Sequence, residues 1–186
     1  GILTFANAPD YETKTTYTAT VTASDGTNSA TQDITVNITD ANDSAPEFTS
    51  SATFSATENQ TSIGTVTATD GDGDTIGFSL SGTDASSMSI NSSSGVLTFN
   101  SAPDYETKSS YSATVTASDG TNSTSQTITV TIVDVDDVAP AFTSNATFSA
   151  TENQTAIGTV TATDTDTDDS SIVFSVSGSE LAITSG

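Results

Sequence analysis

The stretch Tyr111-Ser112-Ala113-Thr114-Val115-Thr116-Ala117 alternates apolar side chains with hydroxyl side chains. The stretch Ile128-Thr129-Val130-Thr131-Ile132 alternates in the same way, and a polar Asp-Gly-Thr-Asn turn at 119–122 lies between the two. A period of two residues indicates β-strands with one buried face and one solvated face. Thr supports the strand on the solvated face because its side chain is branched at Cβ. This part of the chain therefore predicts strand and turn, not helix.

The same pattern occurs a second time in the chain. Residues 8–14 are identical to residues 102–108, which lie 94 positions later, and residues 23–28 are identical to residues 117–122. A match of this length at one period indicates tandem copies of one module of about 94 residues. About seven short strands per module, separated by Gly, Asn, Asp and Ser clusters, are typical of an immunoglobulin-like sandwich. We therefore expect an all-β fold of tandem antiparallel Greek-key β-sandwiches.

Acidic segments at 40–46 and 134–140 mark the module boundaries, and each ends in a proline. If each module begins at the proline that ends an acidic segment, the chain has three parts. They are the C-terminal half of a module at 1–45, a complete module at 46–139, and the N-terminal half of a module at 140–186. The two half-modules are complementary, so residues 1–45 of a neighbouring chain would complete residues 140–186 in a head-to-tail polymer. A piece of a longer repeat array is the alternative.

Charge and composition exclude several functions. The chain has 24 acidic residues, two lysines, no His and no Cys, and its net charge is -22. Without imidazole or thiolate we expect no zinc site, and we predict that the chain is not an enzyme. The negative charge repels nucleic acid and anionic lipid, so we expect neither as a partner. The sequence contains no run of about 18 apolar residues, so we expect no insertion into a membrane. Carboxylates are the only reactive groups in quantity.

Acidic motifs occur in the same order in both copies of the module. They are Glu58-Asn59 and Glu152-Asn153; Asp-Tyr-Glu at 10–12 and 104–106; Asp-x-Asp at 70–72 and 164–166; Asp25 and Asp119; and the two linkers at 40–46 and 134–140. Together these motifs resemble the cadherin repeat in its prokaryotic form, over essentially the whole chain. Residues 40–48 resemble the calcium linker of that family, with Ser44 where typical members have Asn, and Asp-Tyr-Glu resembles its Asp-Arg-Glu motif with Tyr at the centre.

The resemblance implies calcium sites at both junctions, with carboxylates and Asn from three segments as ligands. At the first junction these are Asp10, Glu12, Asp40, Asn42, Asp43, Asp70, Asp72 and Asp119. At the second they are Glu58, Asp104, Glu106, Asp134, Asp136, Asp137, Asp164 and Asp166. Asp25 and Glu152 would serve further junctions of the same kind. The second linker departs from the pattern, because Asp136 replaces the linker Asn and Val138 stands where Ser44 does.

Physical chemistry agrees with a cation at these junctions. Two carboxylates 4 Å apart repel by about 4 kcal/mol at an effective dielectric constant near 20. Calcium takes six to eight oxygen ligands in flexible geometry, and binding only to the folded state adds stability. We therefore expect calcium to stiffen an extracellular structural or adhesin repeat at the cell surface. Asp74 and Asp84, outside the motifs, are predicted to form turns.

Other interpretations remain open. A solvated acidic surface would scatter its charges over the strand faces, where this chain carries mostly Ser and Thr. A calcium-dependent carbohydrate-binding module with a polysaccharide or other cell-surface ligand is the second hypothesis, although only four Tyr, eight Phe and no Trp are available for stacking. Homophilic adhesion of the animal type ranks last, because no Trp is present to act as the exchanged anchor.

Overall fold

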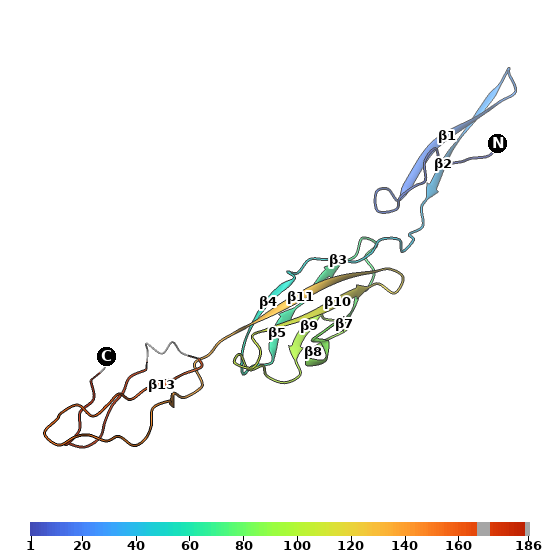
Figure 1. Cartoon of the computed structure of the whole chain (residues 1–186). Helices are drawn as coiled ribbons and strands as arrows, with labels where there is room; N and C mark the ends of the chain where they lie inside the picture. The colour runs from blue at the N-terminus through green and yellow to red at the C-terminus, as the bar shows by residue number, and fades with distance from the viewer. Residues whose placement is uncertain (167–171, 185–186) are drawn as a thin grey trace.

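The computed structural model describes residues 1–166 and 172–184. In this range the chain is built of strands with one short 3₁₀ helix. Figure 1 shows a hairpin, a central sandwich and a C-terminal segment in a row, with the two termini at opposite ends. The strands are β1 (Thr16–Ser24), β2 (Ser29–Asn37), β3 (Glu47–Phe48), β4 (Thr53–Thr57), β5 (Ser62–Thr65), β6 (Ala68–Thr69), β7 (Gly77–Ser81), β8 (Met88–Ile90), β9 (Val96–Phe99), β10 (Ser110–Ser118), β11 (Ser123–Val133), β12 (Ala141–Phe142) and β13 (Ala162–Thr163), and the helix is η1 (Ala85–Ser87).

The centre of the chain is a sandwich of two sheets. One sheet has four strands in the order β4-β11-β10-β7, and the other has three strands in the order β5-β9-β8. β3 and β6 form a separate short antiparallel pair. The long alternating stretches quoted above are β10 and β11, which pair antiparallel from Ser110 opposite Thr131 to Ser118 opposite Ser123. The all-β sandwich that the sequence predicts is therefore confirmed.

One pairing differs from the antiparallel pattern. β4 runs parallel to β11, with Thr53 opposite Thr129 and Thr57 opposite Val133. Parallel strands end at the same edge of their sheet, so the residue after β4 lies beside the start of the second linker. The backbone N–H of Glu58 donates to the carbonyl oxygen of Val133 over 3.1 Å. This pairing carries Glu58 to the second junction.

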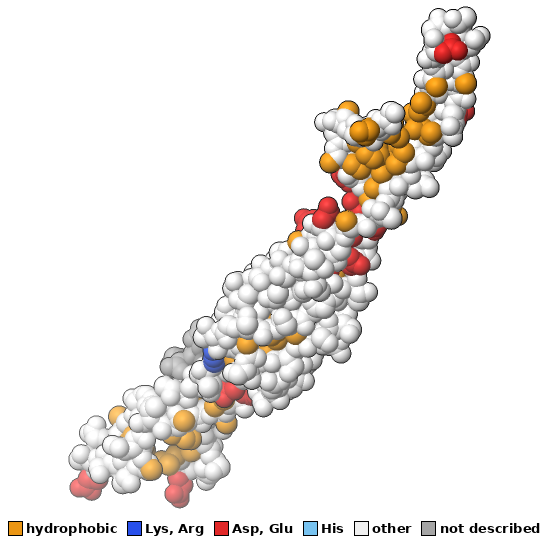
Figure 2. Space-filling view, turned by 90° about the vertical axis from the view of Figure 1, so that its right-hand side faces the viewer, with side chains coloured by type: hydrophobic (Ala, Val, Ile, Leu, Met, Phe, Trp, Pro, Cys, Tyr) orange, Lys and Arg blue, Asp and Glu red, His pale blue; other side chains and the backbone are white. Residues whose placement is uncertain are grey.

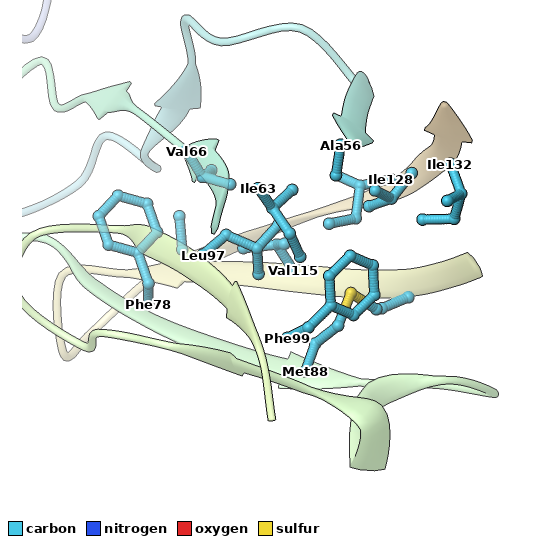
Figure 3. Packing of buried hydrophobic residues seen from close by; sticks show 13 residues of the cluster. Ala56, Ile63, Val66, Phe78, Met88, Leu97, Phe99, Val115, Ile128 and Ile132 are labelled. Carbon is cyan, nitrogen blue, oxygen red and sulfur yellow. The ribbon is translucent and has the colours of Figure 1, made fainter. Parts of the chain in front are cut away.

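The core lies between the two sheets. Figure 3 shows its labelled side chains pointing toward one another from both layers. The side chains of Leu97, Val115, Ile128 and Val130 have no solvent exposure, and each such burial contributes about 1.5–3 kcal/mol. The whole core consists of Ala56, Ile63, Val66, Phe78, Met88, Leu97, Phe99, Ala113, Val115, Ala117, Ile128, Val130 and Ile132.

The flanking segments form only some of the strands that the central sandwich forms. β1 and β2 pair as their counterparts β10 and β11 do, and β12 and β13 pair as β3 and β6 do. The counterparts of β9, β4, β5, β7 and β8 lie at 2–5, 147–151, 156–159, 173–177 and 181–183, and none of them is a strand. Val21 on β1 is 45% exposed, whereas its counterpart Val115 is fully buried.

Candidate functional site

The first linker wraps around one carboxylate of the central sandwich. Asp72 Oδ2 accepts hydrogen bonds from the backbone N–H groups of Asp43, at 3.0 Å, and Ser44, at 2.9 Å. Asp72 Oδ1 accepts a third from Ser44 Oγ at 3.1 Å. Carboxylate oxygens of Glu12, Asp43 and Asp72 lie within 4.8 Å of one another. This cluster joins the first flank, the linker and the sandwich.

A second group of carboxylates adjoins this cluster. Oxygens of Asp70, Asp72 and Asp74 also lie within 4.8 Å of one another. Asp70 Oδ1 accepts the backbone N–H groups of Asp72 and Asp74, while its Oδ2 is buried with no hydrogen-bond donor among the described residues. Asp74 does help to form the turn that the sequence predicts, but the structure also places its carboxylate in the acidic cluster. Its spacing of two residues from Asp72 was the available signal.

The turn between β10 and β11 contacts the same linker. Asn122 Nδ2 donates to Asn42 Oδ1 at 2.8 Å and to the carbonyl oxygen of Ser44 at 3.1 Å. Asp119 Oδ1 accepts the backbone N–H groups of Thr121 and Asn122 at 2.6 Å each. Burial raises the pKa of Asp119, but the hydrogen bonds from Asn122 and Thr121 outweigh it and lower the pKa overall. Asn122 had no signal in the sequence, since its partner Asn42 lies 80 positions away.

The second junction is organised around Glu58, which is only 2% exposed. Glu58 Oε2 accepts the backbone N–H of Tyr105 at 2.8 Å, and Oε1 accepts the backbone N–H of Val135 at 2.7 Å. One buried carboxylate thus fixes the turn before β10 and the start of the linker. Carboxylate oxygens of Glu58, Asp104 and Glu106 lie within 4.8 Å of one another.

Glu106 belongs to two clusters at this junction, because its carboxylate also lies within 4.8 Å of those of Asp134 and Asp166. Burial, together with the neighbouring Asp166 and Glu58 carboxylates, raises the pKa of Glu106 from 4.5 to about 7. Burial followed by the charges of Asp166 and Glu58 also raises the pKa of Asp134. Negative charge is therefore crowded at this point.

Asp166 repeats the geometry of Asp72 with one difference. Its Oδ2 accepts the backbone N–H groups of Val138 and of Asp137, the latter at 2.6 Å, and these bonds lower its pKa. Its Oδ1 is buried and has no hydrogen-bond donor among the described residues. Ser44 supplies that donor at the first junction, and Val138 has no hydroxyl to do so.

The remaining predicted residues lie around these clusters or away from them. Asp10 and Asp104 accept hydrogen bonds from the Thr13 and Thr107 hydroxyls respectively, within their own turns. Asp164 Oδ1 accepts the Asp166 N–H at 3.2 Å, and Asp137 Oδ2 accepts from Asn59 Nδ2. Asp40 and Asp136 are exposed linker residues, and neither joins a cluster among the described residues. Asp25 caps the β1–β2 turn and Glu152 is exposed in the C-terminal segment, so both lie outside the two junctions.

Both junctions suit a hard divalent cation. Their clusters contain carboxylates only, and Figure 2 shows acidic side chains where the flanks meet the sandwich. Calcium prefers carboxylate and carbonyl oxygens, whereas zinc and copper sites use His or Cys. The buried oxygens of Asp70 and Asp166 that lack a donor would gain a partner in such a cation. The donor set therefore fits calcium.

Comparison with known proteins gives one consistent result. Residues 51–133 match the model of the cadherin domain. The chain is 35% identical over 161 residues to the protocadherin-like wing polarity protein stan of Drosophila melanogaster, covering 77% of this chain and 4% of that protein. It is 36% identical over 151 residues to the human cadherin EGF LAG seven-pass G-type receptor 1, covering 76% of this chain and 5% of that protein.

Solved structures of cadherins and protocadherins are similar to this chain as well. A structure of protocadherin gammaB7 EC3-6, a cis-dimer, has a TM-score of 0.72 and 29% identity, and covers 86% of this chain and 44% of that one. Mouse cadherin-23 EC22-24 has a TM-score of 0.67 and 29% identity, and covers 87% of this chain and 57% of that one.

These comparisons bear on two sequence-based predictions, and the structure bears on a third. The proteins compared are named as cadherins, protocadherins or receptors, in agreement with the prediction that this chain is not an enzyme. The two curated relatives are animal proteins, so the prokaryotic form of the repeat stays a prediction. The part of the chain that the structure describes contains no helix long and apolar enough to cross a membrane.

Proposed function

Because this chain belongs to the cadherin-repeat family, we propose that it is a structural repeat of a cell-surface protein whose two acidic junctions bind calcium and thereby become stiff. One observation carries the proposal: at each junction carboxylates from the flank, the linker and the sandwich lie within 4.8 Å of one another, as Glu12, Asp43 and Asp72 do at the first and Glu106, Asp134 and Asp166 at the second. Each junction also holds a buried carboxylate oxygen that has no donor among the described residues, on Asp70 at the first and on Asp166 at the second. Cadherin repeats are adhesion-type extracellular modules, which agrees with a position at the cell surface.

Calcium would stiffen the first junction through three connected parts. Glu12 belongs to the first flank, Asp43 to the linker and Asp72 to the turn between β6 and β7. Without a cation their carboxylates repel one another, by about 4 kcal/mol for a pair 4 Å apart at an effective dielectric constant near 20. A cation that binds all three reverses the sign of this interaction. The flank and the sandwich would then no longer hinge freely about the linker.

A cation would connect the same three kinds of segment at the second junction, where Glu106 is the carboxylate common to both clusters. Glu106 would contribute to both of its clusters, one with Glu58 and Asp104 and the other with Asp134 and Asp166. We assign the remaining motif residues to supporting roles, as further ligands or as groups that position the linker. They are Asp10, Asp40, Asn42, Asp70, Asp119, Asp136, Asp137 and Asp164, with Asp25 and Glu152 reserved for other junctions.

Calorimetry and small-angle X-ray scattering test this proposal together. We expect calcium at a millimolar concentration to raise the unfolding temperature and to lengthen the maximum dimension relative to excess chelator. Asp72→Asn should reduce both effects. Asp33→Asn is the matched control, because Asp33 lies on β2, away from both junctions, where its carboxylate accepts a hydrogen bond from Thr20 Oγ1 at 2.6 Å. Identical traces with calcium and with chelator would overturn the calcium junctions.

We propose in addition that residues 140–184 of one copy pack onto residues 1–45 of another, as the two halves of the central module pack together. The formed and unformed strands support this assignment. Both strand pairs that form in the flanks, β1–β2 and β12–β13, lie within one half of a module. In the central sandwich β4, β5, β7 and β8 all pair with β9, β10 or β11, which belong to the other half.

The apolar faces of the two flanks are consistent with this packing, and Figure 2 shows hydrophobic side chains gathered on both. On the first flank a hollow of about 320 Å³ is lined by Phe5, Tyr17, Ile34 and Val36 among others. On the second, a hollow of about 660 Å³ is lined by residues equivalent to core or near-core positions: Phe148, Ile157, Val160, Phe174, Val176, Leu181 and Ile183. Sedimentation velocity and electron microscopy should reveal linear oligomers, whereas a monodisperse monomer at high calcium would exclude this packing.

A further inference from the structure

The central module contains one ion pair that spans its two halves. Lys108 Nζ lies 2.5 Å from Asp84 Oδ1, and this is the only salt bridge among residues 1–166 and 172–184. Asp84 Oδ2 accepts the backbone N–H of Ser112 at 2.8 Å, so the carboxylate also joins the turn before η1 to β10. The ammonium group of Lys108 lies 4.6 Å from the centroid of the Tyr111 ring. Asp84 precedes η1 in one half, and Lys108 precedes β10 in the other.

The first flank reproduces the lysine side of this arrangement. Lys14 Nζ lies 4.5 Å from the Tyr17 centroid, and its backbone N–H donates to the Asp10 carbonyl at 3.0 Å. The equivalent bond from Lys108 to Asp104 is 2.9 Å long. Lys14 therefore stands in the same place on its hairpin as Lys108 does, but it forms no salt bridge with any described residue.

The C-terminal segment reproduces the acid side. The sequence Ser81-Gly82-Thr83-Asp84 corresponds to Ser177-Gly178-Ser179-Glu180. The two glycines have the same left-handed backbone, with φ of 99° at Gly82 and 105° at Gly178, which supports the alignment. Glu180 is exposed and forms no salt bridge with a described residue. The two segments differ in two respects. The side chain of Glu180 is one methylene longer than that of Asp84, and no residues after Glu180 correspond to the residues of η1.

We propose that Lys14 of one copy and Glu180 of a second copy form the ion pair that closes the seam between two copies. This inference rests on the proposed packing of residues 140–184 onto residues 1–45 and assigns the contact that selects it. The chain has only two lysines in a net charge of -22, and Lys108 is already paired. Lys14 is thus the one remaining lysine that can draw an acidic segment to this otherwise repulsive surface.

The ion pair would fix the direction and register of assembly. Apolar faces tolerate sliding, because the hydrophobic effect has no direction. A charge pair across an interface favours one alignment and penalises others, because a misplaced like charge is costly. With Lys14 on one flank and Glu180 on the other, two first flanks that meet would bring two ammonium groups together. Head-to-tail contact instead brings Lys14 of one copy to Glu180 of the next.

Charge reversal tests the ion pair by sedimentation velocity in millimolar calcium. Lys14→Glu and Glu180→Lys should each weaken self-association by roughly 10-fold, because each brings like charges together. An equimolar mixture of the two variants should regain wild-type association, since the Glu at position 14 of one then meets the Lys at position 180 of the other. Asp33→Lys is the control for charge on the same hairpin and should not weaken assembly.

Net charge alone makes a different prediction. Glu180→Lys makes the chain less negative, so a general reduction in repulsion would strengthen its association, whereas loss of the ion pair weakens it. If the wild-type chain stays monomeric, the packing of the two flanks is wrong and the ion pair falls with it. If the wild-type chain assembles, and both single variants assemble equally well or their mixture is not restored, the ion pair alone is wrong.

Discussion

Replacing Glu58 by Gln tests whether one buried carboxylate organises the second junction. Both of its oxygens accept backbone N–H groups, from Tyr105 and Val135, and Gln can offer only one carbonyl oxygen. One N–H in a site that is 2% exposed would then face an amide NH₂ group. An unsatisfied buried donor costs about 1–3 kcal/mol, so we expect a loss of about 2 kcal/mol in the free energy of unfolding. For a module of this size that loss lowers the unfolding temperature by roughly 10 °C.

The experiment needs conditions that separate hydrogen bonding from charge repulsion. In chelator at pH 5, Glu106 is largely protonated because its pKa is about 7, so removing the charge of Glu58 relieves little repulsion with Glu106. Urea unfolding followed by circular dichroism is suitable, since the chain has no Trp. Glu152→Gln is the matched control: it changes the equivalent, exposed position and should alter stability by less than about 0.5 kcal/mol. A Glu58→Gln variant as stable as this control would refute the assigned role of the two hydrogen bonds.

Three further predictions concern single positions. In chelator, the free energy of unfolding should fall as the pH rises from 4.5 to about 7, because folded Glu106 holds its proton more tightly than the unfolded chain does; Glu106→Gln should remove this slope in pH-dependent urea titrations. Gly95→Ala should cost about 2–4 kcal/mol by urea unfolding, because φ is +69° and the new Cβ would lie 2.1 Å from a backbone oxygen, whereas Gly120→Ala, in open space at φ +99°, should cost about 1 kcal/mol. Val138→Ser should stabilise the calcium-free chain by about 1 kcal/mol and so raise its unfolding midpoint, because the new hydroxyl can donate to Asp166 as Ser44 donates to Asp72. An unchanged midpoint would contradict the equivalence of Ser44 and position 138.

The sequence predicted the sandwich because its strongest signals are local. The alternation in β10 and β11 places Ala113, Val115, Ile128 and Val130 on one face of a hairpin, and all four are buried. The repeat then transfers that assignment to β1 and β2, which pair in the same register. Period and turn chemistry are properties of neighbouring residues, so they can be recognised without knowing what the hairpin packs against.

Contacts between distant segments left no such signal. The parallel pairing of β4 with β11 joins residues 76 positions apart, Thr53 with Thr129, and nothing in either strand specifies it. The sequence assigned Asp84 to a turn and missed its salt bridge to Lys108, 24 positions away. In the same way the acidic motifs include Glu12, Asp43 and Asp72, whose carboxylates lie together at the first junction, but they do not include Asp74, whose carboxylate lies near that of Asp72. Long-range polar pairs depend on the final packing, which periodicity does not encode.

The structure contains hairpins of nearly the same sequence both with and without an opposite sheet. Val21 and Val115 each lie between two Thr residues and opposite a Gln, Gln32 and Gln126 respectively, yet the first Val is 45% exposed and the second is fully buried. The hairpin therefore forms from its own residues, and only the opposite sheet removes its apolar face from water. Residues 173–177 and 181–183 lack that sheet as well, and they form no strands although their counterparts β7 and β8 do. Strand pairing across the two halves and burial of an apolar core therefore occur together in the central module, and neither is present among the described residues of the flanks.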